Sequence, residues 1–124
     1  MSGIPLSFTI RDHRTEHHHY DLMLDVNGAP MFWILPRGIP KEEGERRLAV
    51  EDNDGQIKPG GIVEDGYGVG KAEVWDSGTY EIKKKTRSKI EFEAKGERLL
   101  GRFILLLPSW GRWCRKRVWV LIRL

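Results

Sequence analysis

The chain has 124 residues, of which 40% are hydrophobic and 10% aromatic, enough for one ordinary core but too short for two. Its formal charge of +3 permits a polyanionic partner without requiring one, and its longest apolar run, residues 103–108, is far below the ~20 residues that cross a bilayer. With one cysteine, Cys114, and no internal disulfide possible, we predict a single cytoplasmic domain over residues 1–124, without a membrane partner.

Alternating apolar and polar residues predict short β-strands along most of the chain. Residues 8–11 and 19–26 each show the period of a half-buried strand. Asn27 and Gly28 follow and predict a tight hairpin turn, because both residues tolerate positive φ. Further strands are predicted over residues 31–35, 47–51, 71–76, 79–84, 89–94, 99–107 and 117–123.

The turns between these strands indicate the fold class. Residues 76–78 and 95–97 are predicted turns, and residues 39–47 form the one segment of helical composition, although Gly44 interrupts it. The basic run at residues 83–89 is predicted to be a solvated hairpin tip, with a nucleic-acid contact as the alternative. Short strands with frequent turns are typical of a barrel or sandwich. We therefore predict a mostly β fold, a small closed or partly closed antiparallel β-barrel with one short helical segment.

The four histidines are clustered between His13 and His19. On the strand that starts at His19, alternation places this ring and Asp21 side by side, on the face opposite the apolar residues. If the strands on either side of the intervening loop pair, His13 reaches the same place, whereas His17 and His18 are predicted loop residues. Two imidazoles and a carboxylate suit a divalent transition-metal ion such as Mn²⁺ or Zn²⁺. The alternative is three polar side chains on a solvated face.

Ordered segments along the chain resemble the 3′-phosphoesterase domain of bacterial DNA ligase D. The opening pattern is an aromatic strand, His13, five residues and then His-Tyr-Asp, here residues 19–21. A glycine-rich run at residues 66–71 is a poor P-loop, because Asp65 and Ala72 replace residues that such a loop needs, so we predict a tight turn there. The resemblance extends from residue 8 to about residue 123 and includes residues 33–38, 47–51, 66–70, 74–79, 96–103 and 119–122.

The resemblance implies an enzyme that trims the 3′ ends of DNA or RNA during end joining, by removing a terminal ribonucleoside and then a 3′-phosphate. It implies nucleic-acid 3′-ends as partners. The sequence contains no ligase lysine motif and no polymerase domain, so we expect a stand-alone form. Ligase, polymerase or end-binding proteins would then be separate chains.

The same resemblance implies roles for particular residues. His13, His19 and Asp21 match the metal ligands of the family, with Mn²⁺ as the first expectation and Zn²⁺ or another transition metal as alternatives. Arg37 and Arg47 match basic family positions associated with phosphate binding. From the predicted strand face alone we add a further candidate for phosphate binding, Arg11.

Two residues of the family pattern are missing. The arginine expected two positions after the aspartate ligand is Met23 here, and an active-site histidine expected near residues 52–55 is absent. Asp52 or Asp54 could substitute as an acid or as a fourth metal ligand. The alternative function is therefore a catalytically degenerate relative that binds DNA ends or docks in a repair complex. Cleavage of another phosphoester is a third possibility.

Overall fold

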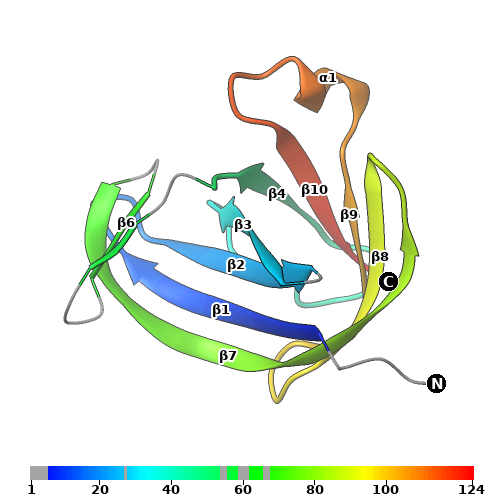
Figure 1. The fold of residues 1–124 in the computed structure, drawn as a ribbon, viewed down its shortest axis with the longest axis horizontal. Helices are drawn as coiled ribbons and strands as arrows, with labels where there is room; N and C mark the ends of the chain where they lie inside the picture. The colour runs from blue at the N-terminus through cyan, green and yellow to red at the C-terminus, as the bar shows by residue number, and fades with distance from the viewer. Residues whose placement is uncertain (1–5, 27, 54–55, 59–61, 66–67) are drawn as a thin grey trace.

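The computed structural model describes residues 6–26, 28–53, 56–58, 62–65 and 68–124, and most of them lie in antiparallel strands (Figure 1). Eight strands close into a barrel in the order β1-β2-β3-β4-β10-β9-β8-β7, and β7 pairs back onto β1. The predicted mostly β, closed antiparallel barrel is thus confirmed. The barrel strands are β1 (Leu6–Arg14), β2 (His19–Val26), β3 (Ala29–Leu35), β4 (Arg46–Glu51), β7 (Gly68–Lys85), β8 (Lys89–Lys95), β9 (Leu100–Leu106) and β10 (Val118–Arg123).

A two-stranded arm extends the sheet outside the closed ring. It consists of β5 (Gln56–Lys58) and β6 (Ile62–Asp65), and β6 pairs with the first residues of β7. In Figure 1 the end of β1 and the start of β2 lie beside this arm. Neither of its strands was predicted from the sequence. As a result, the outer face of β1 and β2 is covered where a bare barrel would expose it.

The barrel interior is filled by the apolar side chains of the alternating pattern. Trp33 and Trp119 pack edge to face with their ring centroids 5.9 Å apart. Phe92 and Phe103 stack at 5.7 Å. Such aromatic pairs contribute about 0.5–1.5 kcal/mol beyond the burial of their area. Other core side chains that are less than 2% exposed include Phe8, Ile10, Leu22, Leu24, Leu35, Tyr80, Ile90 and Leu105.

The predicted break between strands 71–76 and 79–84 is wrong, because β7 runs through it. The Asp76 carboxylate is not used for a local turn. It accepts hydrogen bonds from the backbone N–H groups of Glu97, Arg98 and Leu99, at 3.3, 2.9 and 2.7 Å. A side chain at Gly78 would place its Cβ 2.6 Å from the Lys95 carbonyl oxygen. These residues therefore let β7 curve closely against the turn after β8.

The predicted helix at residues 39–47 is also wrong, because residues 39–45 are irregular and residues 46–47 begin β4. The Glu45 carboxylate accepts the backbone N–H groups of Lys41 and Glu42, both at 2.7 Å, which satisfies them without a helical turn. Gly44 has a φ of 84° and donates its N–H to the Arg123 carbonyl. The helix of the described chain is instead α1 (Ser109–Arg112), in the connection from β9 to β10.

Other local predictions agree with the structure. Gly28 has a φ of 84° in the β2–β3 hairpin, while Asn27 lies outside the described residues. The basic run at residues 83–89 spans the tip between β7 and β8, where its lysines and arginine are largely exposed. Among the described residues, no helix has the length and apolar character needed to cross a membrane.

Candidate metal centre

The pairing of β1 with β2 brings the predicted ligands to one face of the barrel. His13 lies opposite His19, and Arg11 lies opposite Asp21. Residues opposite each other in an antiparallel pair project to the same side of the sheet. Since the alternate residues fill the core, this second set faces outward from it.

The arm covers this outward face. Both histidines are buried, with exposed fractions of 0% for His13 and 2% for His19. β6 supplies the covering groups: Asp65 contacts both rings, and the Val63 carbonyl contacts His13. The alternative of a solvated polar face is therefore wrong. Burial of polar groups on this scale requires that each has a partner.

Four side chains converge beneath the arm. His13 Nδ1 lies 2.9 Å from an Asp21 carboxylate oxygen and 3.0 Å from Asp65 Oδ2. His19 Nε2 lies 3.2 Å from Asp21 Oδ1 and 2.8 Å from Asp65 Oδ2. The two ring nitrogens are themselves 3.0 Å apart. Each of the four residues offers one ligand atom, and these four atoms all lie within 4.8 Å of one another.

The outer nitrogen of each ring points at a backbone carbonyl. His13 Nε2 lies 2.8 Å from the Val63 oxygen and 3.2 Å from the Gly70 oxygen, and His19 Nδ1 lies 2.7 Å from the His17 oxygen. A neutral imidazole has one N–H, and these carbonyls hold it on the outer nitrogen. The inner nitrogens are then acceptors, like the two carboxylates beside them. Such a set of converging acceptors requires a cation, either a proton or a metal ion.

The electrostatics of the cluster support the same conclusion. Burial opposes protonation of His19, but hydrogen bonds to Asp21, Asp65 and the His17 carbonyl, together with the Asp21 charge, overcome it and raise the pKa of His19 to about 10. Burial, together with the nearby Asp65 charge, raises the pKa of Asp21 despite the opposing influence of the adjacent His19 ring. Two adjacent carboxylates in a buried site favour a positive charge between them.

The donor set fits a divalent transition-metal ion. Asp21 Oδ1 is buried without a hydrogen-bond partner, although it lies 3.2 Å from His19. Metal-bound histidines commonly donate their other N–H to a carbonyl or carboxylate, as both rings do here. Two imidazole nitrogens and two carboxylate oxygens suit Mn²⁺ or Zn²⁺ better than Mg²⁺, which prefers oxygen ligands.

Sequence reasoning found three of these four residues and missed Asp65. This residue lies far along the chain from Asp21, on a strand without a clear alternating pattern. The available signal was an acidic residue directly before the glycine-rich run at residues 66–71. Only the folded arm shows that this carboxylate reaches the histidines.

A small cavity of about 250 Å³ adjoins the cluster and contains two other predicted residues. Arg11 lines it together with Asp21 and Asp65, and Asp52 and the apolar Phe32 line it as well. Asp52 is 3% exposed and pairs with the Lys116 ammonium group at 2.9 Å. Asp54, the other suggested substitute, lies outside the described residues.

Arg37 and Arg47 line a different, larger cavity of about 600 Å³. Arg47 is paired with the Glu45 carboxylate at 3.0 Å. Arg37 is exposed. Arg11 thus lines the cavity beside the histidine–aspartate cluster, whereas Arg37 and Arg47 line the larger cavity. The suggested role of all three arginines in phosphate binding stays a prediction.

Comparison with known proteins decides the family. Residues 11–107 match the model of the DNA Ligase D 3′-phosphoesterase domain. The chain belongs to this family. The matched segment contains all four residues of the candidate metal-binding cluster, and it includes the arm that carries Asp65.

Curated relatives of this phosphoesterase-family chain are much longer proteins. It is 29% identical over 126 aligned residues to the multifunctional non-homologous end joining DNA repair protein LigD of Mycobacterium tuberculosis, covering 95% of this chain and 17% of that protein. It is 30% identical over 110 residues to the multifunctional non-homologous end joining protein LigD of Pseudomonas aeruginosa, covering 82% of this chain and 13% of that protein. The chain therefore spans less than a fifth of the length of these relatives.

Proposed function

We propose that the protein is a divalent-metal-dependent 3′-phosphoesterase that processes the 3′ ends of DNA or RNA for non-homologous end joining. The observation that carries this proposal is the buried convergence of His13, His19, Asp21 and Asp65 next to a cavity that contains Arg11. Its substrates would be ends that carry a 3′-ribonucleoside or a 3′-phosphate. Membership of the 3′-phosphoesterase family supports these ends as the first substrates to test.

The four cluster residues would hold the ion, Mn²⁺ in the first instance. A bound divalent ion neutralises phosphate charge and lowers the pKa of a water or ribose hydroxyl. The protein supplies rigid placement: the Val63 and His17 carbonyls orient the two rings, and β-strands carry every ligand. Such support of the ligands keeps their geometry within the narrow tolerance that catalysis needs.

Arg11 is the residue that would bind the substrate phosphate. The arginine expected at Met23 is missing, but Met23 lies diagonally from Arg11 on the same face of the paired strands. Diagonal neighbours have Cα atoms about 7–8 Å apart, within reach of a long side chain. A guanidinium from β1 would therefore reach the region that an arginine at position 23 would serve, and it can hold phosphate oxygens in a bidentate manner.

Asp52 would supply the acid that the missing histidine otherwise provides. It lines the cavity beside the cluster, and its ion pair with the Lys116 ammonium group keeps it oriented but favours the charged carboxylate, so it would first have to take up a proton. A general acid must lie within reach of the leaving group, and the cavity that Asp52 shares with the cluster supports this role. Such a role in end joining would place the protein in the cytoplasm, with ligase and polymerase activities as its partners.

The test is an assay on labelled primers that end in a 3′-phosphate or in a single 3′-ribonucleotide, with and without Mn²⁺. Wild type should release phosphate or nucleoside only with the ion, and His19→Ala should be inactive. His17→Ala is the matched control, because this loop histidine contributes only its backbone carbonyl to the cluster. A folded, ion-loaded wild type that leaves both substrates intact would refute the proposal.

The alternative of a degenerate end-binding module rests on Met23 and on the absence of any histidine after His19. It predicts salt-sensitive binding to 3′-ends that is equal with and without the ion, because phosphate contacts release counterions. Binding of this kind by an inactive wild type would establish it. Docking in a repair complex would instead appear as retention by a ligase or polymerase without DNA.

A further inference from the structure

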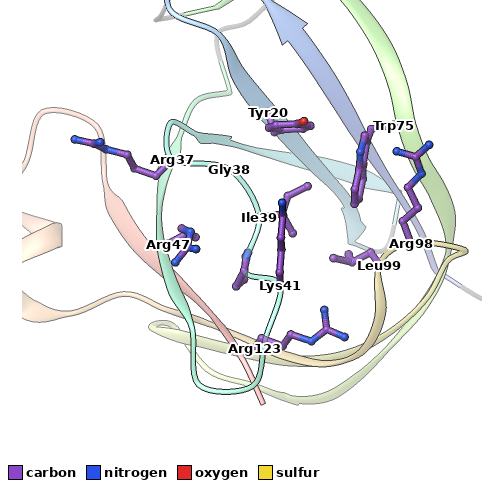
Figure 2. Close-up of a pocket in the computed structure, with 11 residues that line it drawn as sticks. Tyr20, Arg37, Gly38, Ile39, Lys41, Arg47, Trp75, Arg98, Leu99 and Arg123 are labelled. Carbon is purple, nitrogen blue, oxygen red and sulfur yellow. The ribbon is translucent and has the colours of Figure 1, made fainter.

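The larger cavity lies on the opposite face of β2 from the metal-binding cluster. Tyr20 lines it, and this residue sits between His19 and Asp21 in the sequence, so its side chain projects to the other side of the strand. The cavity has a volume of about 600 Å³, which is within the usual range of about 300–1,000 Å³ for small-molecule sites. Figure 2 shows its lining residues.

One side of the cavity is aromatic. Tyr20 and Trp75 meet edge to face with their ring centroids 5.9 Å apart, and both are only half-buried. The Arg98 guanidinium lies over Trp75, 5.0 Å from the ring centroid. In Figure 2 the two rings lie on the same side of the cavity. This wall offers flat, partly exposed surface to a planar ligand.

The rest of the lining is strongly basic. Among the residues the structure describes, the cavity is lined by five cationic side chains and by no carboxylate. Only part of this charge is compensated nearby, because Arg47 pairs with Glu45, whereas Lys41 and Arg98 form no ion pair with another described residue. The five cations are Arg37, Lys41, Arg47, Arg98 and Arg123.

We propose that this cavity binds single-stranded nucleic acid, with a base against the Tyr20 and Trp75 rings and backbone phosphates at the surrounding cations. Aromatic rings within a basic groove are the general means by which proteins hold single strands without reading sequence. Inorganic phosphate would need only the cations and would not explain the aromatic wall. A peptide ligand would find no carboxylate among the described lining residues to pair with its basic groups.

This inference rests on and deepens the proposed function, because it names how the strand upstream of the processed end is held. A strand bound at Tyr20 lies across β2 from the ion ligands, so the cavity and the cluster would grip different nucleotides of one chain. Binding in the cavity requires no metal ion. The two proposals therefore fail separately.

The experiment measures binding of a 5′-fluorescein-labelled thymidine strand of about twelve nucleotides by anisotropy, in chelator, at several salt concentrations. The variant Lys41→Gln/Arg98→Gln should bind more weakly and lower the slope of log affinity against log salt by about 1.4, since each lost single-strand phosphate contact removes about 0.7. The matched control is Lys84→Gln/Lys85→Gln, which removes the same charge from the exposed end of β7. This control should bind like wild type.

Two results would overturn the inference. If the control loses as much affinity as the cavity variant, the strand binds at the hairpin tip or by net charge alone. If an abasic strand of equal length binds wild type as tightly as the thymidine strand, the cavity is an anion site only. We expect the abasic strand to bind at least about fivefold more weakly. Asp21→Asn should bind the strand normally, which separates this result from any failure of the metal centre.

Discussion

Asp65 provides the sharpest test of the metal centre, because its carboxylate joins the arm to both histidines. An ion that binds only the folded state stabilises it by RT ln(1 + [ion]/Kd), about 2.7 kcal/mol at a hundred times Kd. A domain of this size should gain about 3–5 °C per kcal/mol, by interpolation between smaller and larger domains. Wild type should therefore melt about 8–13 °C higher in Mn²⁺ or Zn²⁺ than in chelator.

Asp65→Asn removes one charged ligand and keeps the shape of the side chain. Loss of an outer-shell partner alone lowers metal affinity by about 10–100-fold, and we expect the upper end for a direct ligand. At the same ion concentration, the stabilisation then falls to about RT ln 2, or 0.4 kcal/mol, and the shift to about 1–2 °C.

The measurement is a thermal melt of each protein in chelator and in each ion, so that each variant is its own reference. Glu64→Gln is the matched control, because it removes one charge from the adjacent, exposed position of β6. It should retain the full shift, and Mg²⁺ should give a smaller one in every protein. Equal shifts in wild type and Asp65→Asn would refute the role of Asp65. No shift with any transition-metal ion would refute the centre itself.

Three further outcomes are expected. Arg11→Gln should lower kcat/KM on a 3′-phosphate by about 10²-fold without changing the ion-dependent melting shift, and an unchanged rate would show that Arg11 does not bind the phosphate. Burial alone would raise the pKa of Asp76, but backbone N–H donors hold it below its ordinary value. Asp76→Asn should therefore lower the unfolding free energy at pH 7 by about 1–3 kcal/mol in urea titrations, and this difference should shrink as the pH falls below about 4 and disappear below the lowered pKa of the folded state. Gly70→Ala would place a Cβ 2.0 Å from the Arg14 carbonyl oxygen. Chemical denaturation should show that it destabilises the fold by about 1–3 kcal/mol, and a smaller ion-dependent melting shift should show that it weakens ion binding.

Local pattern was sufficient for the barrel and for three of the cluster residues. His13, His19 and Asp21 lie on adjacent strands joined by a short loop, so alternation and antiparallel pairing determine which face they share. Their burial could not be predicted in the same way. It depends on the arm, whose two short strands have no strong alternating pattern and pair with each other and with β7.

Both wrong secondary-structure predictions involve carboxylates that accept hydrogen bonds from backbone N–H groups, in one case from another hairpin and in the other from the same segment. Asp76 was taken as a turn former, but its carboxylate binds the N–H groups of a turn on another hairpin. The composition of residues 39–47 predicts a helix, but the Glu45 carboxylate accepts two N–H groups of its own irregular segment. In both cases a hydrogen bond that only the folded chain reveals overrides composition.

β6 contributes both the Asp65 carboxylate of the cluster and the Val63 carbonyl that orients the His13 ring. Loading of the ion and docking of the hairpin should consequently be one thermodynamic event. Hydrogen exchange at residues 62–65 should slow when the ion is added, and a protease that cuts only an undocked hairpin should become ineffective at the same ion concentration. The concentration of available transition-metal ions in a cell would thereby also set the fraction of molecules in which this hairpin is docked on the barrel.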